Sequence, residues 1–249
     1  ARSEADWYVG LNATRALTTK HNAQLNCGRV QTPTLAIIQA RDETIKNFKP
    51  KTFYGLDVVT DKLTFKWTDG KGYSTFDENQ IDKVSQKLNA ASLIVKDVQK
   101  KKKKQFAPGL YDLTELQRDA NKIFGMSAKE TLQTMQALYE RHKVLTYPRT
   151  DSKFISEDIV DTLKERVEVS GIGQFSKVAA RVLRAPLKTN SSFVNDSKVS
   201  DHHAIIPTES PVFLADFTER EKRIYELVVQ RFMSVLLPPY EYEVTTVTA

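Results

Sequence analysis

Helical and strand-like patterns of apolar residues alternate along the first hundred positions. Helical periodicity is found over residues 5–18, from Thr32-Pro33 onward, where a threonine followed by proline favours a helix start, and over residues 77–89. Between residues 52 and 67, two aromatic and β-branched runs flank three polar residues, which predicts a hairpin. A further strand is expected over residues 92–98. The first part of the chain is therefore predicted to mix helices with a small β-structure.

From residue 107 onward the pattern is mostly helical, and three capping sequences mark predicted helix starts. In each, a serine or threonine precedes a glutamate or glutamine by three residues, so that the two side chains can satisfy free backbone N–H groups. The pairs are Thr114 with Gln117, Ser127 with Glu130, and Thr218 with Glu221. Gly125 is expected to end the first of these helices. The later helices are predicted over residues 157–168, 174–185 and 219–236.

Two short helices around Gly125, followed by the strand-like "VLTY" that ends at Tyr147, are typical of a helix-turn-helix or winged helix. After prolines 238–239, "EYEVTTVT" alternates like a strand, and we expect it to pair with the 52–67 or the 92–98 region. The predicted fold class is multidomain α+β. Mostly helical domains, one of them winged-helix-like and bearing the tyrosine, are expected beside a separate β-domain.

Composition narrows the class of protein. The 249 residues carry a formal net charge of +6, with a pI near 9.2, which favours polyanionic partners. A single cysteine, Cys27, excludes an internal disulfide and a multi-cysteine zinc ribbon and fits a reducing cytoplasm. No apolar run approaches the roughly 18 residues of a membrane span, and no signal peptide opens the chain. Because the sequence begins without methionine and stops inside a strand-like pattern, we expect it to be a piece of a longer protein.

A block of five lysines, Lys100–Lys104, follows the strand predicted over residues 92–98. Such a block is consistent with a nucleic-acid patch. We favour a solvated strand extension or linker, because like charges in a run repel one another and stay hydrated. The sequence leaves open whether these lysines contact DNA.

Four polar clusters are candidates for chemistry. They are "LNATRALT" with Asn12, Thr14 and Arg15; "NCGRVQTPTL", residues 26–35; "LTYPRTDS", residues 145–152; and "SDHHAIIPTE", residues 200–209. In the second cluster Gly28 permits close backbone approach and Arg29 and Gln31 present planar donors. The predicted helix that follows offers free N–H groups to a phosphate. The alternative is that Arg15 is a solvated helix charge and that Arg29 and Gln31 only cap a loop.

The tyrosine of the third cluster, Tyr147, admits two interpretations. Pro148 restrains it to extended geometry, as at a strand that enters a turn. A phenol close to the guanidinium of Arg149 would also suit covalent attack on a phosphodiester, which needs nearby positive charge because a phenol is a weak nucleophile at neutral pH. His202 and His203 suggest a metal, but neighbours on an extended segment point to opposite faces. A histidine that acts on a phosphate is therefore favoured.

Three motifs, "GRVQTPTL", "LTYPRTDS" and "DHHAIIPT", resemble in order and spacing those of the type IA DNA topoisomerases, most of all the topoisomerase III branch. The resemblance implies that Tyr147 is the nucleophile, which becomes linked to the 5′ phosphate and leaves a free 3′ hydroxyl. It implies that Arg149 holds the scissile phosphate and that His202 lies near it. It further implies a single-strand groove formed by Arg15, Asn26, Cys27, Gly28, Arg29, Val30 and Gln31. Cys27 departs from the small residue usual at its position.

The same resemblance implies a division into domains. Residues 1–48 would begin domain IV, residues 49–106 and 236–249 would form domain II, the β-arch, and residues 107–235 would form domain III with the tyrosine. In the family a Toprim domain holds Mg²⁺ through acidic residues, and no "DxDxE" pattern occurs in this chain. We therefore expect no metal site or cofactor in these residues, Mg²⁺ held by the missing Toprim domain, and no requirement for ATP.

The expected function is that of the central fragment of a type IA DNA topoisomerase, whose parent cleaves one DNA strand, passes a strand and reseals the break. The fragment alone is expected to bind single-stranded DNA as a cytoplasmic monomer and to be inactive. Its partners would be DNA and the Toprim domain of the same parent chain. The alternative is a non-enzymatic winged-helix module that binds nucleic acid and never forms a covalent adduct.

Overall fold

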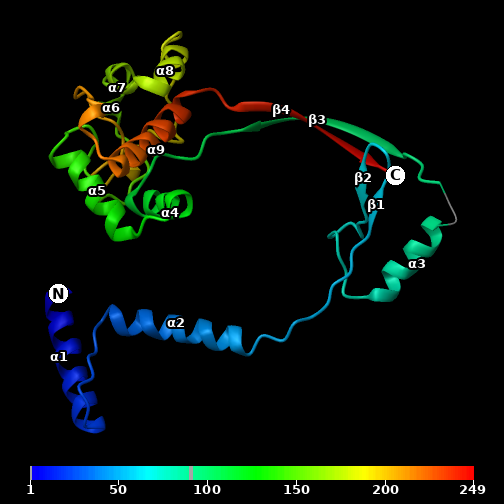
Figure 1. Ribbon diagram of the computed structural model, residues 1–249, viewed down its shortest axis with the longest axis horizontal. Coiled ribbons are helices and arrows are strands. Elements are labelled where there is room, and N and C mark those ends of the chain that lie inside the picture. Colours follow the sequence, from blue (N-terminus) through cyan, green and yellow to red (C-terminus); the bar gives the residue numbers. More distant parts are fainter. Residues whose placement is uncertain (1, 90–91) are drawn as a thin grey trace. The chain divides into compact units, whose positions relative to one another are not determined.

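The chain folds as two compact units, Ala1–Ile94 and Val95–Ala249, in a computed structural model that describes residues 2–89 and 92–249. Each unit combines helices with one two-stranded sheet, so the mixed α and β class predicted from the sequence is confirmed (Figure 1). The division of the sequence into parts of three domains stays a prediction.

The first unit carries the elements that the apolar pattern predicts. They are α1 (Arg2–His21), α2 (Gln31–Lys46), the antiparallel strands β1 (Asp57–Val59) and β2 (Thr64–Lys66), and α3 (Glu78–Asn89). The second helix starts earlier than predicted. α2 begins at Gln31, before the expected start at Thr32-Pro33, and Thr32 does not cap it. The hydroxyl of Thr32 instead accepts a hydrogen bond from the backbone N–H of Gly28 and so ties the preceding loop to the first turn.

The second unit is mostly helical. Its elements are β3 (Asp97–Gln105), α4 (Leu113–Phe124), α5 (Ala128–Glu140), α6 (Glu157–Val160), α7 (Leu163–Ser170), η1 (Gly173–Phe175), α8 (Ser176–Val182), η2 (Asp196–Lys198), η3 (Leu214–Asp216), α9 (Glu219–Leu236) and β4 (Tyr240–Thr248). The helix predicted over residues 157–168 is therefore broken into α6 and α7. The helix predicted over 174–185 begins as a 3₁₀ turn and ends early, at Val182.

Local chemistry explains where these helices begin and end. Both Ser127 with Glu130 and Thr218 with Glu221 form complete capping boxes, as predicted. The predicted capping box at Thr114 was wrong. The side chain of Asp112 caps α4, so the cap lies two residues earlier in the sequence. Gly125 ends α4 in the left-handed region at φ +69°, a conformation that glycine adopts without steric cost.

The segment before Tyr147 forms no regular strand, contrary to the prediction. Leu145 makes an isolated antiparallel bridge with Pro207, which is flanked by the bonds Thr146 N to Ile206 O and Thr208 N to Val144 O. Pro148 and Pro207 have no N–H to donate, so a ladder cannot grow from this bridge.

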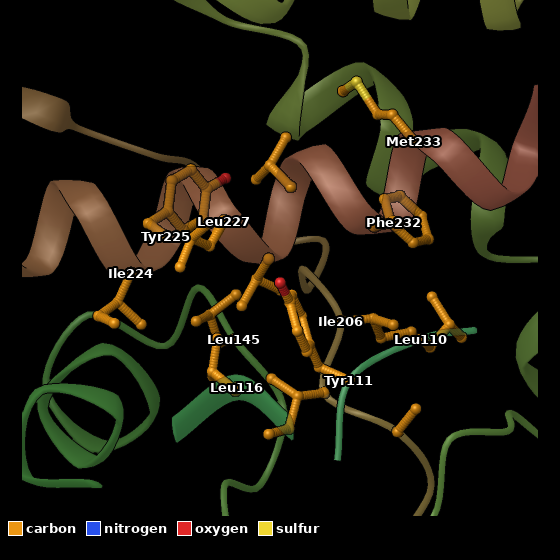
Figure 2. Packing of buried hydrophobic residues seen from close by; sticks show 14 of the residues in the cluster. Leu110, Tyr111, Leu116, Leu145, Ile206, Ile224, Tyr225, Leu227, Phe232 and Met233 are labelled. Atoms are coloured by element: carbon orange, nitrogen blue, oxygen red, sulfur yellow. The ribbon is translucent and has the colours of Figure 1, made fainter. Parts of the chain in front are cut away.

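The hydrophobic core of the second unit is built around α9. The side chains of α9 that are buried include Ile224, Tyr225, Val228, Val229, Phe232 and Met233, and they pack with Leu116 of α4 and Met135 and Leu138 of α5 (Figure 2). The same cluster holds Leu145 and Ile206, which lie close in sequence to Tyr147 and His202. Burying one such side chain stabilises the fold by about 1.5–3 kcal/mol, so the core fixes both segments firmly.

A long antiparallel ribbon connects the two ends of the second unit. β3 pairs with β4 from Asp97↔Thr248 to Gln105↔Tyr240 (Figure 1). The predicted pairing of "EYEVTTVT" is thereby confirmed. The partner strand, however, begins five residues later than the predicted 92–98 strand, and it takes up the whole lysine block.

Candidate active site

The site of the second unit is centred on the rings of Tyr147 and His202. Their centroids lie 4.2 Å apart at an interplanar angle of 39°. Tyr139, near the end of α5, packs edge-on against Tyr147 at 5.5 Å and 81°. Tyr147 and Tyr139 are half-buried, whereas His202 is exposed. The Tyr147 ring therefore packs against two other aromatic rings and remains partly exposed to solvent.

Side-chain hydroxyl groups, rather than a β-ladder, bring the two segments together. Thr146 Oγ1 donates to the carbonyl of Ala204 at 3.0 Å and accepts from the N–H of Ile206, also at 3.0 Å. The backbone N–H of Ala204 donates to the carbonyl of Phe154 at 2.9 Å. These bonds fasten the chain on both sides of Tyr147 to the chain that follows His202.

Thr150 makes the most direct link to the histidine. Its hydroxyl donates to the backbone carbonyl of His202 at 3.0 Å, across 52 positions of sequence, and accepts from the N–H of Ser152. Ser152 is buried, and its hydroxyl bonds the carbonyl of Lys198 at 2.9 Å. The "TDS" part of the motif thus has a structural role that the sequence analysis did not assign. The hydroxyl pattern itself was the available signal.

Arg149 is exposed, and within the described part of the chain its guanidinium has no hydrogen bond or ion pair. No strand forms here, so Arg149 and Tyr147 do not share a strand face. Arg149 is two residues from Tyr147, and its positive charge is accessible to solvent. Such a group can accept an anion without first breaking an internal contact.

His203 differs from its neighbour in environment. It is half-buried, and its Nδ1 lies 2.8 Å from the carbonyl of Ala204. Burial lowers the pKa of the His203 imidazole below its usual value, and the nearby charges of Arg166 and His202 lower it further. The two adjacent histidines therefore occupy different environments, in agreement with the argument against a shared metal.

A buried arginine, Arg166 on α7, anchors the segment after the histidines. Its guanidinium donates to the carbonyl of Pro207 at 2.7 Å and to Thr162 Oγ1 at 2.8 Å, and it pairs with Glu209 at 2.6 Å. Arg166 was missed from the sequence, because nothing in "LKERVEVS" distinguishes a buried arginine from a solvated one. These contacts hold residues 207–209 against α7.

The predicted single-strand groove lies in the first unit, along α1 and the loop before α2. Thr14 Oγ1 accepts from the N–H of Cys27 at 2.9 Å and donates to its carbonyl at 3.2 Å. A Cβ at Gly10 would meet the Cys27 carbonyl at 3.5 Å, an ordinary van der Waals contact, so the loop lies directly against α1. Asn26, Val30, Gln31 and Arg15 are exposed, and Cys27 and Gly28 are half-buried.

Arg29 does not stand free in this loop. Its Nε lies 2.5 Å from Oδ1 of Asp6 on α1, and this hydrogen bond raises the pKa of Arg29 above its usual value. Both side chains are well exposed, so the pair is weak and easily exchanged for a phosphate. The structure therefore presents Arg29 with its charge partly compensated.

A metal site needs several donor side chains close together. Within residues 2–89 and 92–249, no three histidine, cysteine, aspartate or glutamate side chains gather in a way that could hold an ion. In the same part of the chain, no helix is both long and apolar enough to span a bilayer.

The whole chain, residues 1–249, matches the family model described as DNA topoisomerase, and the chain belongs to that family. The class expected from the three motifs, type IA of the topoisomerase III branch, is confirmed by the relatives. The chain is 60% identical over 248 residues to a DNA topoisomerase 3 of Bacillus cereus and 51% identical over 251 residues to that of Bacillus subtilis strain 168. It covers 99–100% of its own length in these matches but 34% of each relative.

A solved structure shares the fold. Full-length topoisomerase I from Thermotoga maritima superposes with a TM-score of 0.68 at 26% identity, covering 97% of this chain and 39% of that one. The chain therefore spans about a third of the length of the curated relatives it matches, and a similar part of this structural neighbour.

Proposed function

We propose that this chain is the central part of a type IA DNA topoisomerase in which Tyr147 transiently cleaves one DNA strand. The observation that carries the proposal is the contact between Tyr147 and His202, two polar rings held 4.2 Å apart by segments anchored in the core. Membership of the DNA topoisomerase family supports the assignment of DNA as the substrate.

The phenol oxygen of Tyr147 attacks the phosphorus of a single-strand phosphodiester. A new bond forms between phosphorus and the tyrosine oxygen, and the bond to the 3′ oxygen breaks. The phenol loses its proton and the departing 3′ oxygen gains one. Because the phosphotyrosine conserves the energy of the original ester, the reverse attack by the 3′ hydroxyl reseals the strand without ATP.

Two side chains assist this exchange in our proposal. Arg149, exposed and without an internal partner among the described residues, holds the scissile phosphate and offsets the charge that develops in the transition state. His202 contacts the same phosphate from its exposed side. Thr150 and Thr146 are positioning residues, because they act on the backbone that carries the two rings.

The experiment that tests the chemistry uses the polarity of the adduct. A single-stranded oligonucleotide is labelled at its 3′ end in one sample and at its 5′ end in another, and the longer protein that contains this chain is trapped with each under denaturing conditions. A 5′-phosphotyrosine leaves the 3′ label on the protein and releases the 5′-labelled piece with a free 3′ hydroxyl. Label from the 5′ end on the protein, or no adduct with either, would contradict the proposal. A winged-helix module that only binds DNA gives the latter result.

Single-strand binding is proposed to use Arg15 and residues 26–31 of the first unit. The loop is clamped to α1 by Thr14, and its exposed polar side chains lie at the start of α2, where free N–H groups favour a phosphate. Titration of labelled single-stranded and duplex DNA at two salt concentrations tests this. We expect preference for the single strand and weaker binding at higher salt, because phosphate contacts release counterions.

The proposal also covers the scaffold of the tyrosine, the metal and the parent protein. α4 and α5, joined at Gly125, serve as a winged-helix-like scaffold for the tyrosine, and the β3–β4 ribbon belongs to a β-arch. Mg²⁺ is supplied by a Toprim domain of the same parent protein, and no step above is assigned to it. The parent is proposed to act as a monomer in the cytoplasm, and the 249 residues alone are proposed to bind DNA without cleaving it efficiently.

A further inference from the structure

The β3–β4 ribbon has two chemically different faces. Successive side chains of a strand point to opposite sides, so the register assigns each residue to a face. One face, here called the paired face, carries Lys100, Lys102, Lys104, Glu241 and Glu243. The opposite face, here called the tyrosine face, carries Gln99, Lys101, Lys103, Gln105, Tyr240, Tyr242, Val244 and Thr246.

Lysines of the paired face are largely neutralised within the ribbon. Lys104 Nζ lies 2.7 Å from a carboxylate oxygen of Glu241, its direct cross-strand partner. Lys100 Nζ lies 3.3 Å from a carboxylate oxygen of Glu243, which is also the cross-strand partner of Lys102. This face therefore resembles an ordinary solvated surface with its own ion pairs.

The tyrosine face leaves its lysines available. Among residues 2–89 and 92–249, neither Lys101 nor Lys103 has an ion-pair partner. Their cross-strand neighbours are Val244 and Tyr242, which carry no charge. Lys102 on the paired face also has no ion-pair partner among the described residues, so the tyrosine face differs in that both of its lysines lack one and lie beside aromatic rings.

Tyr240 and Tyr242 form an exposed aromatic platform on that face. Their rings are stacked, with centroids 5.7 Å apart and planes inclined by 19°. Tyr240 is 69% exposed and Tyr242 is 37% exposed, although the burial of either ring would be favourable. Large aromatic side chains left in water beside unpaired lysines are the combination used to bind single-stranded nucleic acid, in which bases stack on rings and cations meet the phosphates.

We propose that the tyrosine face of the β3–β4 ribbon is a second binding site for single-stranded DNA, separate from the Tyr147 site and from the loop of residues 26–31. Tyr240 and Tyr242 stack against unpaired bases, and Lys101 and Lys103 contact the backbone phosphates. Single strands are favoured over duplex because the bases of a duplex are already stacked on one another. The inference rests on the proposed function in one respect, since it takes DNA as the ligand.

The test compares the two faces in the longer protein that contains this chain, with Tyr147→Phe present throughout so that no adduct can form. One variant carries Lys101→Gln and Lys103→Gln, and another carries Tyr240→Val and Tyr242→Val, which preserve strand propensity. The matched control carries Lys100→Gln and Lys104→Gln, which remove the same two charges from the other face of the same strand. Affinity for a labelled oligothymidylate is measured over a series of salt concentrations.

We expect the tyrosine variant to weaken binding about 5- to 100-fold. The Lys101/Lys103 variant should reduce the slope of log affinity against log salt by about 1.4, because about 0.7 counterion is released per single-strand contact. The control should change neither quantity appreciably. Equal effects from both lysine pairs would overturn the proposal, as would no effect from the tyrosine variant, since a merely solvated or generally basic ribbon gives those results.

Photo-crosslinking separates this inference from the proposed chemistry. An oligonucleotide that carries 5-iodouracil is irradiated on the same Tyr147→Phe protein, and crosslinks are mapped to peptides. Crosslinks at Tyr240 or Tyr242 are expected, whereas crosslinks confined to residues outside the ribbon would overturn the site. Since cleavage plays no part in this readout, failure of the ribbon site leaves the adduct test untouched. Failure of the adduct test equally leaves the ribbon result standing.

Discussion

The hydroxyl of Thr150 donates a hydrogen bond to the backbone carbonyl of His202 at 3.0 Å, which ties the tyrosine loop to the histidine segment. The same oxygen accepts from the N–H of Ser152. Thr150 is buried, so its two bonds are shielded from competition with water. The relative placement of Tyr147 and His202 thus depends on a side chain that bonds the backbone of both segments.

Thr150→Val removes this link and keeps the shape of the side chain. We expect the free energy of unfolding to fall by about 1–3 kcal/mol, because the His202 carbonyl and the buried N–H of Ser152 both lose their partner. We also expect slower adduct formation at saturating DNA, with Thr150→Ser near wild type in both respects. Chemical denaturation and single-turnover trapping measure the two effects. Normal adduct formation by a destabilised Thr150→Val protein would show that this alignment does not matter for cleavage.

The sequence predicted this site unevenly. Tyr147, Arg149 and His202 were proposed from the sequence because their motifs are local, and the helix cap at Thr218 was predicted correctly for the same reason. Arg166 and Thr150 were missed because their partners lie far away in sequence, across 41 and 52 positions. The predicted strand before Tyr147 failed because β-branched residues indicate extended backbone, whereas a ladder also needs N–H donors that Pro148 and Pro207 lack.

The hydroxyl of Tyr225 is buried and has no hydrogen-bond partner in the described residues. Its burial raises the pKa of the phenol, and its ring packs edge-on against Phe217 at 5.5 Å. We expect Tyr225→Phe to leave the unfolding free energy unchanged or to raise it by up to about 1 kcal/mol, since an unsatisfied polar group leaves the core. Denaturant unfolding measures this.

A second buried tyrosine provides the matched control for that measurement. Tyr111 donates from its hydroxyl to Asp119 Oδ2 at 2.6 Å, so Tyr111→Phe should lower the unfolding free energy by about 1 kcal/mol. Equal destabilisation by Tyr225→Phe and Tyr111→Phe would mean that the Tyr225 hydroxyl is satisfied in solution.

His203 should make stability depend on pH. Its folded pKa lies below the value of about 6.5 expected for an unfolded histidine, chiefly because it is buried, and the charges of Arg166 and His202 lower it too. The hydrogen bond with the Ala204 carbonyl and the charge of Asp158 act in the opposite direction. Below about pH 6.5 the unfolded chain therefore binds a proton that the folded chain does not, and stability falls as pH drops toward the folded pKa. Above about pH 6.5 both states are neutral and the effect disappears.

Replacement of the imidazole tests this assignment. His203→Asn preserves a donor near the Ala204 carbonyl and does not titrate in this range. Unfolding free energies at about pH 7.5 and about pH 5.5 should differ less in His203→Asn than in the wild type. The difference should not exceed about 1.4 kcal/mol per pH unit. An identical pH dependence in both proteins would assign the titration to other groups.

Asp6 should restrain DNA binding by the first unit, because it pairs with Arg29. Asp6→Asn is expected to tighten single-strand binding about two- to fivefold, the scale of an exposed ion pair. Asp42→Asn is the matched control, since Asp42 pairs with Lys46 at 2.6 Å on α2, outside the predicted groove. Titration of labelled single-stranded DNA compares the two. Equal tightening by both variants would indicate a general effect of net charge.

The sequence alone did not decide whether Lys100–Lys104 contact DNA or form a solvated strand extension. A run of five lysines does not reveal which of its members face acidic partners, because this depends on the register with a strand some 140 positions later. Only the pairing of β3 with β4 separates the neutralised Lys100 and Lys104 from Lys101 and Lys103. By contrast, the strand character of "EYEVTTVT" was predicted correctly, since period-two alternation is a local property.

The central claim is that Tyr147 is the nucleophile, and Tyr139 offers a matched control because its ring lies 5.5 Å from that of Tyr147. The measurement is covalent trapping of 3′-labelled single-stranded DNA by the longer protein that contains this chain, as wild type, Tyr147→Phe and Tyr139→Phe. The account predicts labelled adducts with the wild type and with Tyr139→Phe, and none with Tyr147→Phe, while all three bind the oligonucleotide with similar affinity. Adducts that persist in Tyr147→Phe would contradict it.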